Sequence, residues 1–296
     1  MPKPLDHLVL PVCDLETARG RLSALGFTVA PVGTHPFGTE NACVFFADGT
    51  FLEPIAIGQR EAAEEAARAG NAFVARIMAY RFRVGEDGFC ALVMGSDNAD
   101  EDHRRFVAAG LSGGGIVGFS RPFKTPAGDE DTASFKLAFA ADLRAPDAFA
   151  FTCERINVPA VDRSALQRHE NGALSISEIV AVEQNPTDFQ YLLQEVVGAR
   201  EVEANSFGMR IVTGGSTISV VTPEGFAAFF GSAVELPTRG LRFAAVVYRV
   251  ANLDALKSLL DRAAVSYDMV GQRLVVAPAA GQGAHFAFEA QEPTTQ

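Results

Sequence analysis

The sequence predicts an α+β protein built from four copies of one β-α-β-β-β unit. The chain has 296 residues, of which 48% are hydrophobic and 21% charged, which is typical of a globular protein long enough for two domains. In each unit an apolar strand pattern gives way to a helical period, and strand-like segments follow. A repeated order outweighs any single local assignment. The four units span residues 5–57, 89–156, 174–222 and 241–290.

The first unit shows the pattern most clearly. Residues 5–12 alternate as a strand does, and His7 is set among apolar neighbours. Asp14 is a helix N-cap residue type and Gly26 a helix stop, so we expect a helix between them. Three further strands are predicted at residues 27–32, 42–46 and 50–57.

The later units repeat this order with weaker signals. Residues 159–171 form a polar, proline-containing segment between the second and third units, where we expect a domain boundary. The prediction is therefore one domain over residues 1–160 and another over residues 161–296. Further helices are expected at residues 59–76, 100–109, 186–197 and 253–264.

Charge and cysteine content narrow the class of partner. The net charge of −11 argues against a general nucleic-acid binder and against docking on anionic membranes, and it leaves a small-molecule substrate as the expected partner. The N-terminus lacks the apolar segment of a signal peptide, and no apolar run is long enough for a membrane span. We expect a cytoplasmic protein with reduced thiols, because its cysteines occur singly, at Cys13, Cys43, Cys90 and Cys153.

The opening segment LDHLVLPVCDL, followed by a helix and then GFTV, resembles the start of the vicinal oxygen chelate superfamily. That superfamily includes glyoxalase I, bleomycin resistance proteins and extradiol dioxygenases. The fuller resemblance is to its glyoxalase-like domain branch. It implies that the units pair into two half-open barrels, the first of them around a divalent metal. The matching motifs are His35-Pro36-x-Gly38-Thr39-x-Asn41, Phe51-Leu52-Glu53, Ser120-Arg121-Pro122 and His169-x-Asn171-Gly172-Ala173.

The resemblance also implies a set of metal ligands. In the superfamily they come from the first and last strands of the paired units, which here gives His7, Glu53 and Glu154. The first strand of the second unit departs from the pattern, because it places Ala91 or a neighbour at the fourth position. The site therefore has three protein ligands, or it has lost its metal. One histidine with two carboxylates suits Zn²⁺, Mn²⁺, Ni²⁺ or Fe²⁺. Glu154 is also the expected catalytic residue that moves a proton on the substrate.

Four further residues are candidates for substrate binding: His35, Asn41, Arg121 and His169. The Gly/Pro loop that carries His35 and Asn41 would close over the pocket, although the same residue types also serve ordinary turns. Arg121 would pair with a substrate carboxylate, or else form a surface ion pair. His169 would reach the rim as an acid or base, or else lie solvated in the linker.

The second domain carries a poorer donor set. Glu178 stands at the His7 position and Glu289 at the Glu53 position, while Ser219 and Ala245 fill the other two. Two carboxylates without a histidine favour a structural or pairing role, and the chain is expected to be a monomer with internally paired units or a homodimer. His285 shares a strand face with Glu289 by alternation, which keeps a second site open.

The function that these expectations favour is a metal-dependent enzyme. Its one divalent metal (Zn, Mn, Ni or Fe) would chelate a small oxygenated substrate as a Lewis acid, in lyase or isomerase chemistry. One alternative is a metal-free small-molecule binding protein of the bleomycin-resistance type. The other is an extradiol-type dioxygenase, although Glu178 and Ala245 stand where the second domain of such enzymes carries histidines.

Overall fold

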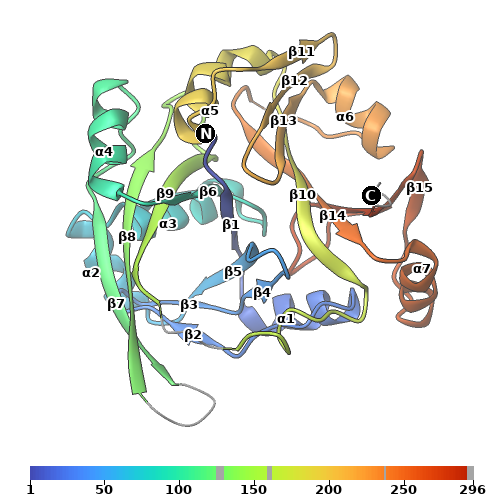
Figure 1. Ribbon diagram of the computed structural model, residues 1–296, viewed down its shortest axis with the longest axis horizontal. Coiled ribbons are helices and arrows are strands. Elements are labelled where there is room, and N and C mark those ends of the chain that lie inside the picture. The colour runs from blue at the N-terminus through green and yellow to red at the C-terminus, as the bar shows by residue number, and fades with distance from the viewer. Residues whose placement is uncertain (125–129, 159–161, 237, 292–296) are drawn as a thin grey trace.

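The computed structural model describes residues 1–124, 130–158, 162–236 and 238–291. It contains two curved, mixed β-sheets of nine and eight strands that lie side by side, with helices packed around them (Figure 1). The predicted α+β fold of repeated units is confirmed.

The nine-stranded sheet is formed by the first half of the chain. Its order is β2-β3-β5-β1-β6-β9-β8-β7, and β4 pairs with β5. The strands are β1 (Leu5–Pro11), β2 (Gly33–Thr34), β3 (Thr39–Asn41), β4 (Val44–Phe45), β5 (Phe51–Ile57), β6 (Ala91–Ser96), β7 (Val117–Lys124), β8 (Glu130–Ala140) and β9 (Phe149–Asn157).

The second half of the chain forms the eight-stranded sheet, in the order β11-β12-β13-β10-β14-β17-β16-β15. The strands are β10 (Ala173–Val182), β11 (Glu203–Asn205), β12 (Gly208–Val212), β13 (Thr217–Val221), β14 (Arg242–Val250), β15 (Asp268–Val270), β16 (Arg273–Val276) and β17 (His285–Ala290).

Both sheets are built from two units joined in the same way. In the first sheet β1 pairs parallel with β5, β6 pairs parallel with β9, and the unit-opening strands β1 and β6 pair antiparallel with each other. The second sheet repeats this arrangement with β10 beside β13, β14 beside β17, and β10 antiparallel to β14. Each sheet is therefore one half-barrel made of two related units, as the resemblance implies.

The helices follow the prediction with some differences. The side chain of Asp14 caps α1 by accepting from the Thr17 amide. The expected helix over residues 59–76 is two helices, because Gly70 adopts a φ of +90° and Asn71 caps a new start. Helix α6 was not predicted. The helices are α1 (Leu15–Ala24), α2 (Arg60–Arg68), α3 (Ala72–Val84), α4 (Ala99–Ala108), α5 (Gln190–Val197), α6 (Pro223–Phe230) and α7 (Leu253–Arg262), with a 3₁₀ turn at Pro186–Phe189.

The strand expected at residues 27–32 is irregular backbone. The Arg19 guanidinium donates hydrogen bonds to the carbonyl oxygens of Val29 and Ala30, at 3.1 and 2.7 Å. These two oxygens therefore do not accept hydrogen bonds from a neighbouring strand. Pairing begins only afterwards, at β2.

The two halves share one apolar core. The Phe27 ring, from the first half, lies 5.2 Å from the ring of Tyr248 and 6.1 Å from that of Phe288, both from the second half. A backbone hydrogen bond from Asn171 to Gly26 also joins them. The division into domains at residues 160 and 161 stays a prediction, since both positions lie outside the described residues.

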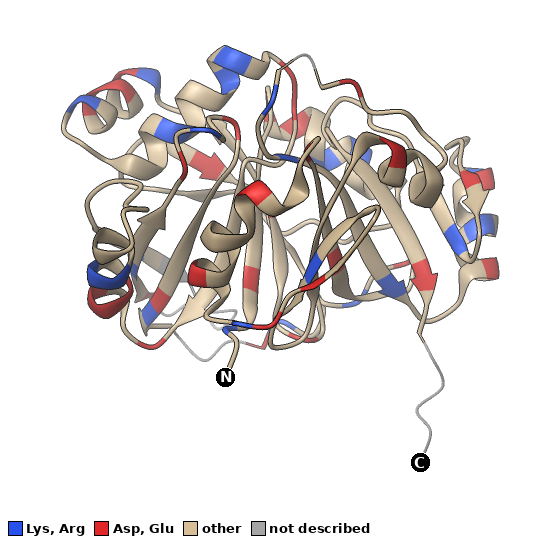
Figure 2. Ribbon diagram, turned by 90° about the horizontal axis from the view of Figure 1, so that it is seen from above, with Lys and Arg blue, Asp and Glu red and all other residues tan. Residues whose placement is uncertain are grey.

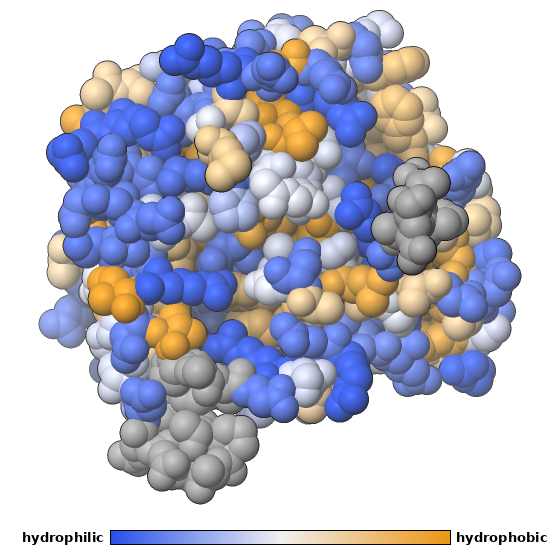
Figure 3. Space-filling view, viewed as in Figure 1, coloured by the Kyte–Doolittle hydropathy of each residue, from blue (hydrophilic) through white to orange (hydrophobic). Residues whose placement is uncertain are grey.

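Charged and hydrophobic residues are mixed over the surface. In Figure 2 the Lys and Arg residues are interspersed with Asp and Glu, and the face in Figure 3 carries small hydrophobic patches among hydrophilic residues. Within the described part of the chain, no helix combines the length and apolar character that crossing a membrane requires.

Candidate functional site

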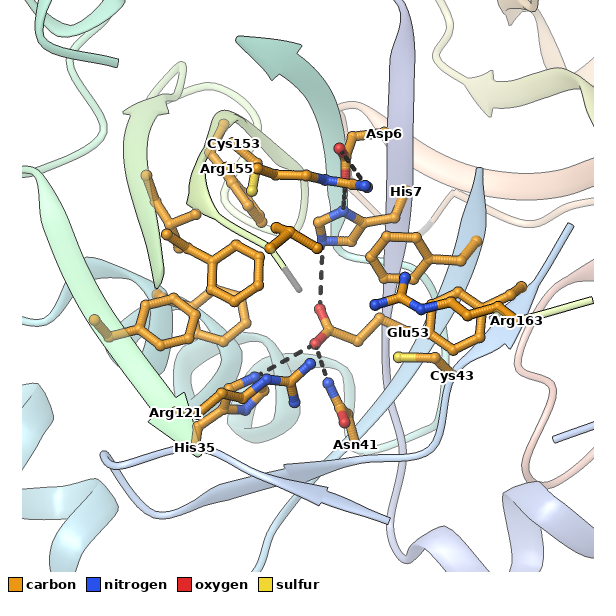
Figure 4. A pocket seen from close by; sticks show the side chains of 18 residues that line it. Asp6, His7, His35, Asn41, Cys43, Glu53, Arg121, Cys153, Arg155 and Arg163 are labelled. Atoms are coloured by element: carbon orange, nitrogen blue, oxygen red, sulfur yellow. Dashed lines mark hydrogen bonds and ion pairs between the residues drawn. The ribbon is translucent and has the colours of Figure 1, made fainter. Parts of the chain in front are cut away.

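A cavity lies on the inner face of the first sheet, and its empty space is about 680 Å³ with the open mouth included. Strands β1, β3, β4, β5, β7, β8 and β9 contribute to its wall (Figure 4). Helix α3 adds Phe73. The cavity brings polar groups of both charges together within an aromatic lining. Its six phenylalanines are Phe45, Phe51, Phe73, Phe119, Phe135 and Phe151.

His7 is oriented by its neighbour in the sequence. Its Nδ1 lies 2.6 Å from Oδ1 of Asp6, and its ring stacks on Phe51 with the ring centroids 4.3 Å apart. Adjacent strand residues normally face opposite sides, but the β1–β6 register shifts between Leu5 and His7, which allows both side chains to meet. The second carboxylate oxygen of Asp6 pairs with Arg155 at 2.8 Å. The Asp6–His7 pair therefore aims Nε2 of His7 into the cavity.

Glu53 lies opposite that nitrogen. It projects from β5, which runs parallel to β1, and its Oε2 is 3.4 Å from Nε2 of His7. Its other oxygen, Oε1, accepts a hydrogen bond of 2.7 Å from the side-chain amide of Asn41. Glu53 is buried, so the carboxylate depends on these partners in place of water.

His35 completes the group from the turn between β2 and β3. Its Nδ1 contacts Oγ1 of Thr39 at 2.9 Å, and its Nε2 lies 3.8 Å from Oε1 of Glu53. Gly38 makes this turn possible, since it adopts a φ of +83° and a Cβ there would lie 2.5 Å from the Gln59 carbonyl oxygen. The loop lies against the pocket, as expected from the sequence.

The environment sets the charge of each group. Burial lowers the pKa of His35 to about 4, so this imidazole is neutral near pH 7. Burial alone would raise the pKa of Glu53, but His7, His35 and Asn41 together lower it to about 2 and keep it ionised. Burial disfavours the charged form of His7, but the carboxylates of Asp6 and Glu53 outweigh it and raise the pKa of His7.

Arg121 also lines the cavity, so the structure brings together His7, Glu53, His35, Asn41 and Arg121 from the set named by the sequence. Glu154 and His169 do not line it.

Glu154 points away from the cavity. On β9 the cavity is lined by Phe151 and Cys153, and strand alternation turns the next side chain to the opposite face. There the Glu154 carboxylate accepts a hydrogen bond of 2.9 Å from the Ala99 amide at the start of α4. The expectation that Glu154 is a ligand and catalytic residue is therefore not supported by its position.

His169 fastens the linker to the first half of the chain. Its Nδ1 accepts from the Thr28 amide at 3.0 Å, so Nε2 carries the proton and donates to the Phe45 carbonyl at 2.9 Å. Burial lowers the pKa of this imidazole, which agrees with a neutral, structural histidine.

Some residues of the cavity were not predicted as site residues from the sequence. Asp6 would have been assigned to the opposite face, since the register shift has no sequence signal. Arg155 lies two residues after Cys153 and shares its face, so correct phasing of β9 would have found it. Arg163 comes from an irregular segment, where periodicity gives no direction.

The donors at this site, two imidazoles and a carboxylate, are of the types that a divalent metal takes. Two donors that each bind an ion at about 2.1 Å in a tetrahedral arrangement lie about 3.4 Å apart. Oε2 of Glu53 lies 3.4 Å from Nε2 of His7, and the other oxygen, Oε1, lies 3.8 Å from Nε2 of His35. Hydrogen bonding of the outer nitrogen of His7 to a carboxylate is also usual for metal-binding histidines. Among the described residues, however, no three His, Cys, Asp or Glu side chains are gathered closely enough to form a finished metal site.

A comparison with known families finds one match. Residues 5–197 match the family described as "Glyoxalase-like domain". The chain belongs to this glyoxalase-like family. The resemblance seen in the opening strand and the loop around His35 is thereby confirmed. No curated protein matches the chain.

Solved structures share the fold at low sequence identity. A hypothetical protein from Staphylococcus aureus has a TM-score of 0.66 at 12% identity, covering 97% of this chain and 99% of that one. A mutant 4-hydroxymandelate synthase from Streptomyces coelicolor has a TM-score of 0.60 at 14% identity, with coverage of 99% and 94%. The Mn(II)-bound glyoxalase from Novosphingobium aromaticivorans has a TM-score of 0.53 at 12% identity, with coverage of 98% and 83%. At these identities the likeness shows the fold alone.

Helix caps and strand register give the second-unit counterparts of His7 and Glu53. Asp14 and Asn98 cap the helices that follow β1 and β6, and each lies seven residues after His7 and Ala91 respectively. His7 pairs with Phe51 in β5, two residues before Glu53, and in the second unit Ala91 pairs with Phe149, two residues before Phe151. Ala91 and Phe151 are therefore the counterparts of His7 and Glu53, and both are buried and apolar. The sequence-based match of Glu154 to Glu53 is out of register by three residues.

In the second sheet, the positions that correspond to His7 and Glu53 belong to a cluster of ion pairs. The Arg273 guanidinium lies 2.7 Å from Glu178 and 3.1 Å from Glu289, and Ser219 donates a hydrogen bond to Glu178 at 2.5 Å. His285 is buried separately, beside the Phe226 ring. A guanidinium thus stands between the two carboxylates of this half-barrel.

Proposed function

We propose that the protein is a glyoxalase-like enzyme that binds one divalent metal at His7, His35 and Glu53 and acts on a small oxygenated substrate in lyase or isomerase chemistry. The observation that carries the proposal is the Asp6–His7 pair, whose second imidazole nitrogen faces the ionised Glu53 inside an aromatic cavity. The bound ion would supply Lewis acidity that polarises a substrate oxygen. The Mn(II)-bound state of the structurally similar glyoxalase from Novosphingobium aromaticivorans supports the same assignment.

The chain's own residues provide the rest of the chemistry. Asp6 fixes the ring of His7, and Asn41 holds one oxygen of Glu53, so neither donor has to reorganise when substrate arrives. Burial raises the pKa of the Cys43 and Cys153 thiols, so neither is a nucleophile near neutral pH. Proton movement on the substrate is therefore left to the Glu53 carboxylate or to the imidazole of His35, which is neutral near pH 7.

A second candidate is an Fe²⁺ oxygenase. Two histidines and one carboxylate are the ligand set of many non-haem Fe²⁺ oxygenases, and His7, His35 and Glu53 provide these groups. A third candidate, the metal-free binding protein, draws support from the apolar Ala91 and Phe151 at the remaining ligand positions.

One experiment separates the three candidates. The protein is treated with EDTA, reloaded separately with Zn²⁺, Mn²⁺, Ni²⁺ or Fe²⁺, and incubated in D₂O with a panel of small α-hydroxycarbonyls and catechols. The proposal predicts metal-dependent deuterium incorporation next to the carbonyl by NMR, lost in Glu53→Gln and kept in Glu154→Gln. Uptake of O₂ by the Fe²⁺ form instead would establish the oxygenase. Neither exchange nor uptake with any of the four metals would refute both enzymes and leave the binding protein.

A further inference from the structure

The cavity carries an excess of positive charge in an acidic protein. Three arginines line it (Arg121, Arg155 and Arg163), against two carboxylates, Asp6 and Glu53. Asp6 is taken by Arg155 at 2.8 Å, and Glu53 faces His7. Within the part of the chain that the structure describes, no carboxylate pairs with Arg121 or Arg163. Because the whole chain carries a net charge of −11, this local excess points to a ligand and not to the general composition.

Both arginines are held against aromatic rings. The Arg163 guanidinium lies 4.8 Å from the Phe45 ring centroid, and that of Arg121 lies 5.9 Å from the Phe135 centroid. In Figure 4 both guanidinium groups point towards the space around Glu53. Stacking of this kind fixes the plane of a guanidinium and leaves its N–H edge free for a planar oxyanion.

Space for Arg121 depends on Gly33. A Cβ at Gly33 would lie 2.7 Å from Nη1 of Arg121 and 2.7 Å from Oδ1 of Asn41. The bare backbone at this position therefore admits the guanidinium beside Asn41, in the same group of residues that holds Glu53. The absence of a side chain at this β2 position thus allows Arg121 to reach the site.

The rest of the lining determines the shape of the ligand. Six phenylalanine rings surround the polar groups, and rings of this kind favour flat, apolar bodies in stacked or edge-to-face contact. We propose that the substrate is a small organic acid with a flat apolar body, whose oxyanion is bound by Arg121 and Arg163 while its oxygenated carbon faces Glu53. This inference rests on the proposed function only in taking the cavity as the substrate site.

Binding of matched probes to the EDTA-treated protein tests the inference without reference to any metal. Benzoate and benzamide have nearly the same shape and differ in charge, and phenyl phosphate tests a second oxyanion. Titration calorimetry should show benzoate binding at least about tenfold more tightly than benzamide, because each charged hydrogen bond is lost in the neutral probe. Tighter binding of phenyl phosphate than of benzoate would identify a phosphate as the oxyanion and support the same site.

Variants assign the contacts. Arg121→Met and Arg163→Met should each weaken benzoate binding about tenfold or more and leave benzamide binding unchanged, whereas Arg121→Lys should recover part of the loss. Arg60→Met removes the same charge from exposed helix α2 and is the matched control. Circular dichroism verifies that each variant is folded.

The inference is overturned if benzoate and benzamide bind equally, or if Arg60→Met weakens benzoate binding as much as the two cavity variants do. It is separable from the metal proposal. Charge-selective binding without any metal uptake keeps the oxyanion site and refutes the metal site, and metal uptake without charge selectivity does the reverse.

Discussion

Asp6→Asn tests whether Asp6 orients His7 for metal binding or only stabilises the fold. Asp6 is 8% exposed and contacts His7 at 2.6 Å and Arg155 at 2.8 Å. Asparagine has almost the same shape but no charge. A buried hydrogen bond between charged groups contributes about 1.5–3 kcal/mol, whereas Arg155 is 37% exposed and its ion pair contributes little. We therefore expect a loss of about 1.5–3 kcal/mol of unfolding free energy, or about 3–12 °C in Tm.

The same substitution should weaken metal binding. Removing the carboxylate that orients a metal-binding histidine typically lowers metal affinity about 10- to 100-fold. The assays are thermal unfolding and a calorimetric titration with Mn²⁺ or Zn²⁺, carried out on the same preparations.

Asp102→Asn provides the matched control for this effect. Asp102 is 4% exposed and pairs with Lys3 at 3.0 Å, but it lies outside the cavity. Both variants should lose stability, and only Asp6→Asn should lose metal affinity. Equal metal affinity in the two variants would refute the orienting role of Asp6, whatever the loss of stability.

Three further substitutions test other parts of the structure. Gly38→Ala should lower the free energy of unfolding by more than the roughly 1–3 kcal/mol of left-handed backbone strain, because the new Cβ also meets the Gln59 carbonyl. Gly49 has a φ of +90° but no atom within 4 Å of its Cβ position, so Gly49→Ala introduces the strain without the clash. Equal losses of Tm in the two variants would disprove the contribution of the clash. Burial lowers the pKa of His169, so the unfolded chain binds a proton at this imidazole at a higher pH than the folded chain does. As the pH falls below about 6.5, the wild type should therefore lose stability relative to His169→Gln in thermal melts. Parallel curves of Tm against pH would contradict this. Arg273→Met should destabilise the second half-barrel by leaving Glu178 facing Glu289, and adding Glu178→Gln should restore part of the loss in denaturant titrations; no rescue would show that the cluster is not an electrostatic unit.

The fold was readable because its signals are local and repeat. A helix follows the opening strand of every unit, and in three of the four units its N-cap is an Asp or Asn, namely Asp14, Asn98 or Asn252. This recurrence converts weak local preferences into a topology. Helix α6 was missed because it follows a strand through a Thr222 cap and Pro223 in a unit already assigned its helix. The irregular segment 27–32 was missed because Arg19, in the preceding helix α1, donates hydrogen bonds to its carbonyl groups.

Only the site residues that lie on regular strands, or in a motif that matches the family, could be predicted from the sequence. His7 and Glu53 stand in the best-matched unit, and the motif around His35 supplies the loop that meets them. Glu154 shows where this reasoning ends, since a small shift in register turns a side chain to the opposite face, and register is fixed by pairing with β6 and β8. Asp6 depends on a bulge, and Arg163 on the path of an irregular segment, neither of which has a periodic signal.

Metal content is the most direct test of the central claim. Protein purified without an affinity tag is reloaded with Mn²⁺ or Zn²⁺, freed of excess ion and analysed for metal per chain. The wild type and Glu154→Gln should hold about one ion per chain, and His7→Ala and Glu53→Gln should hold none. An empty wild-type protein, or an ion kept by both His7→Ala and Glu53→Gln, would contradict a metal site at His7, His35 and Glu53.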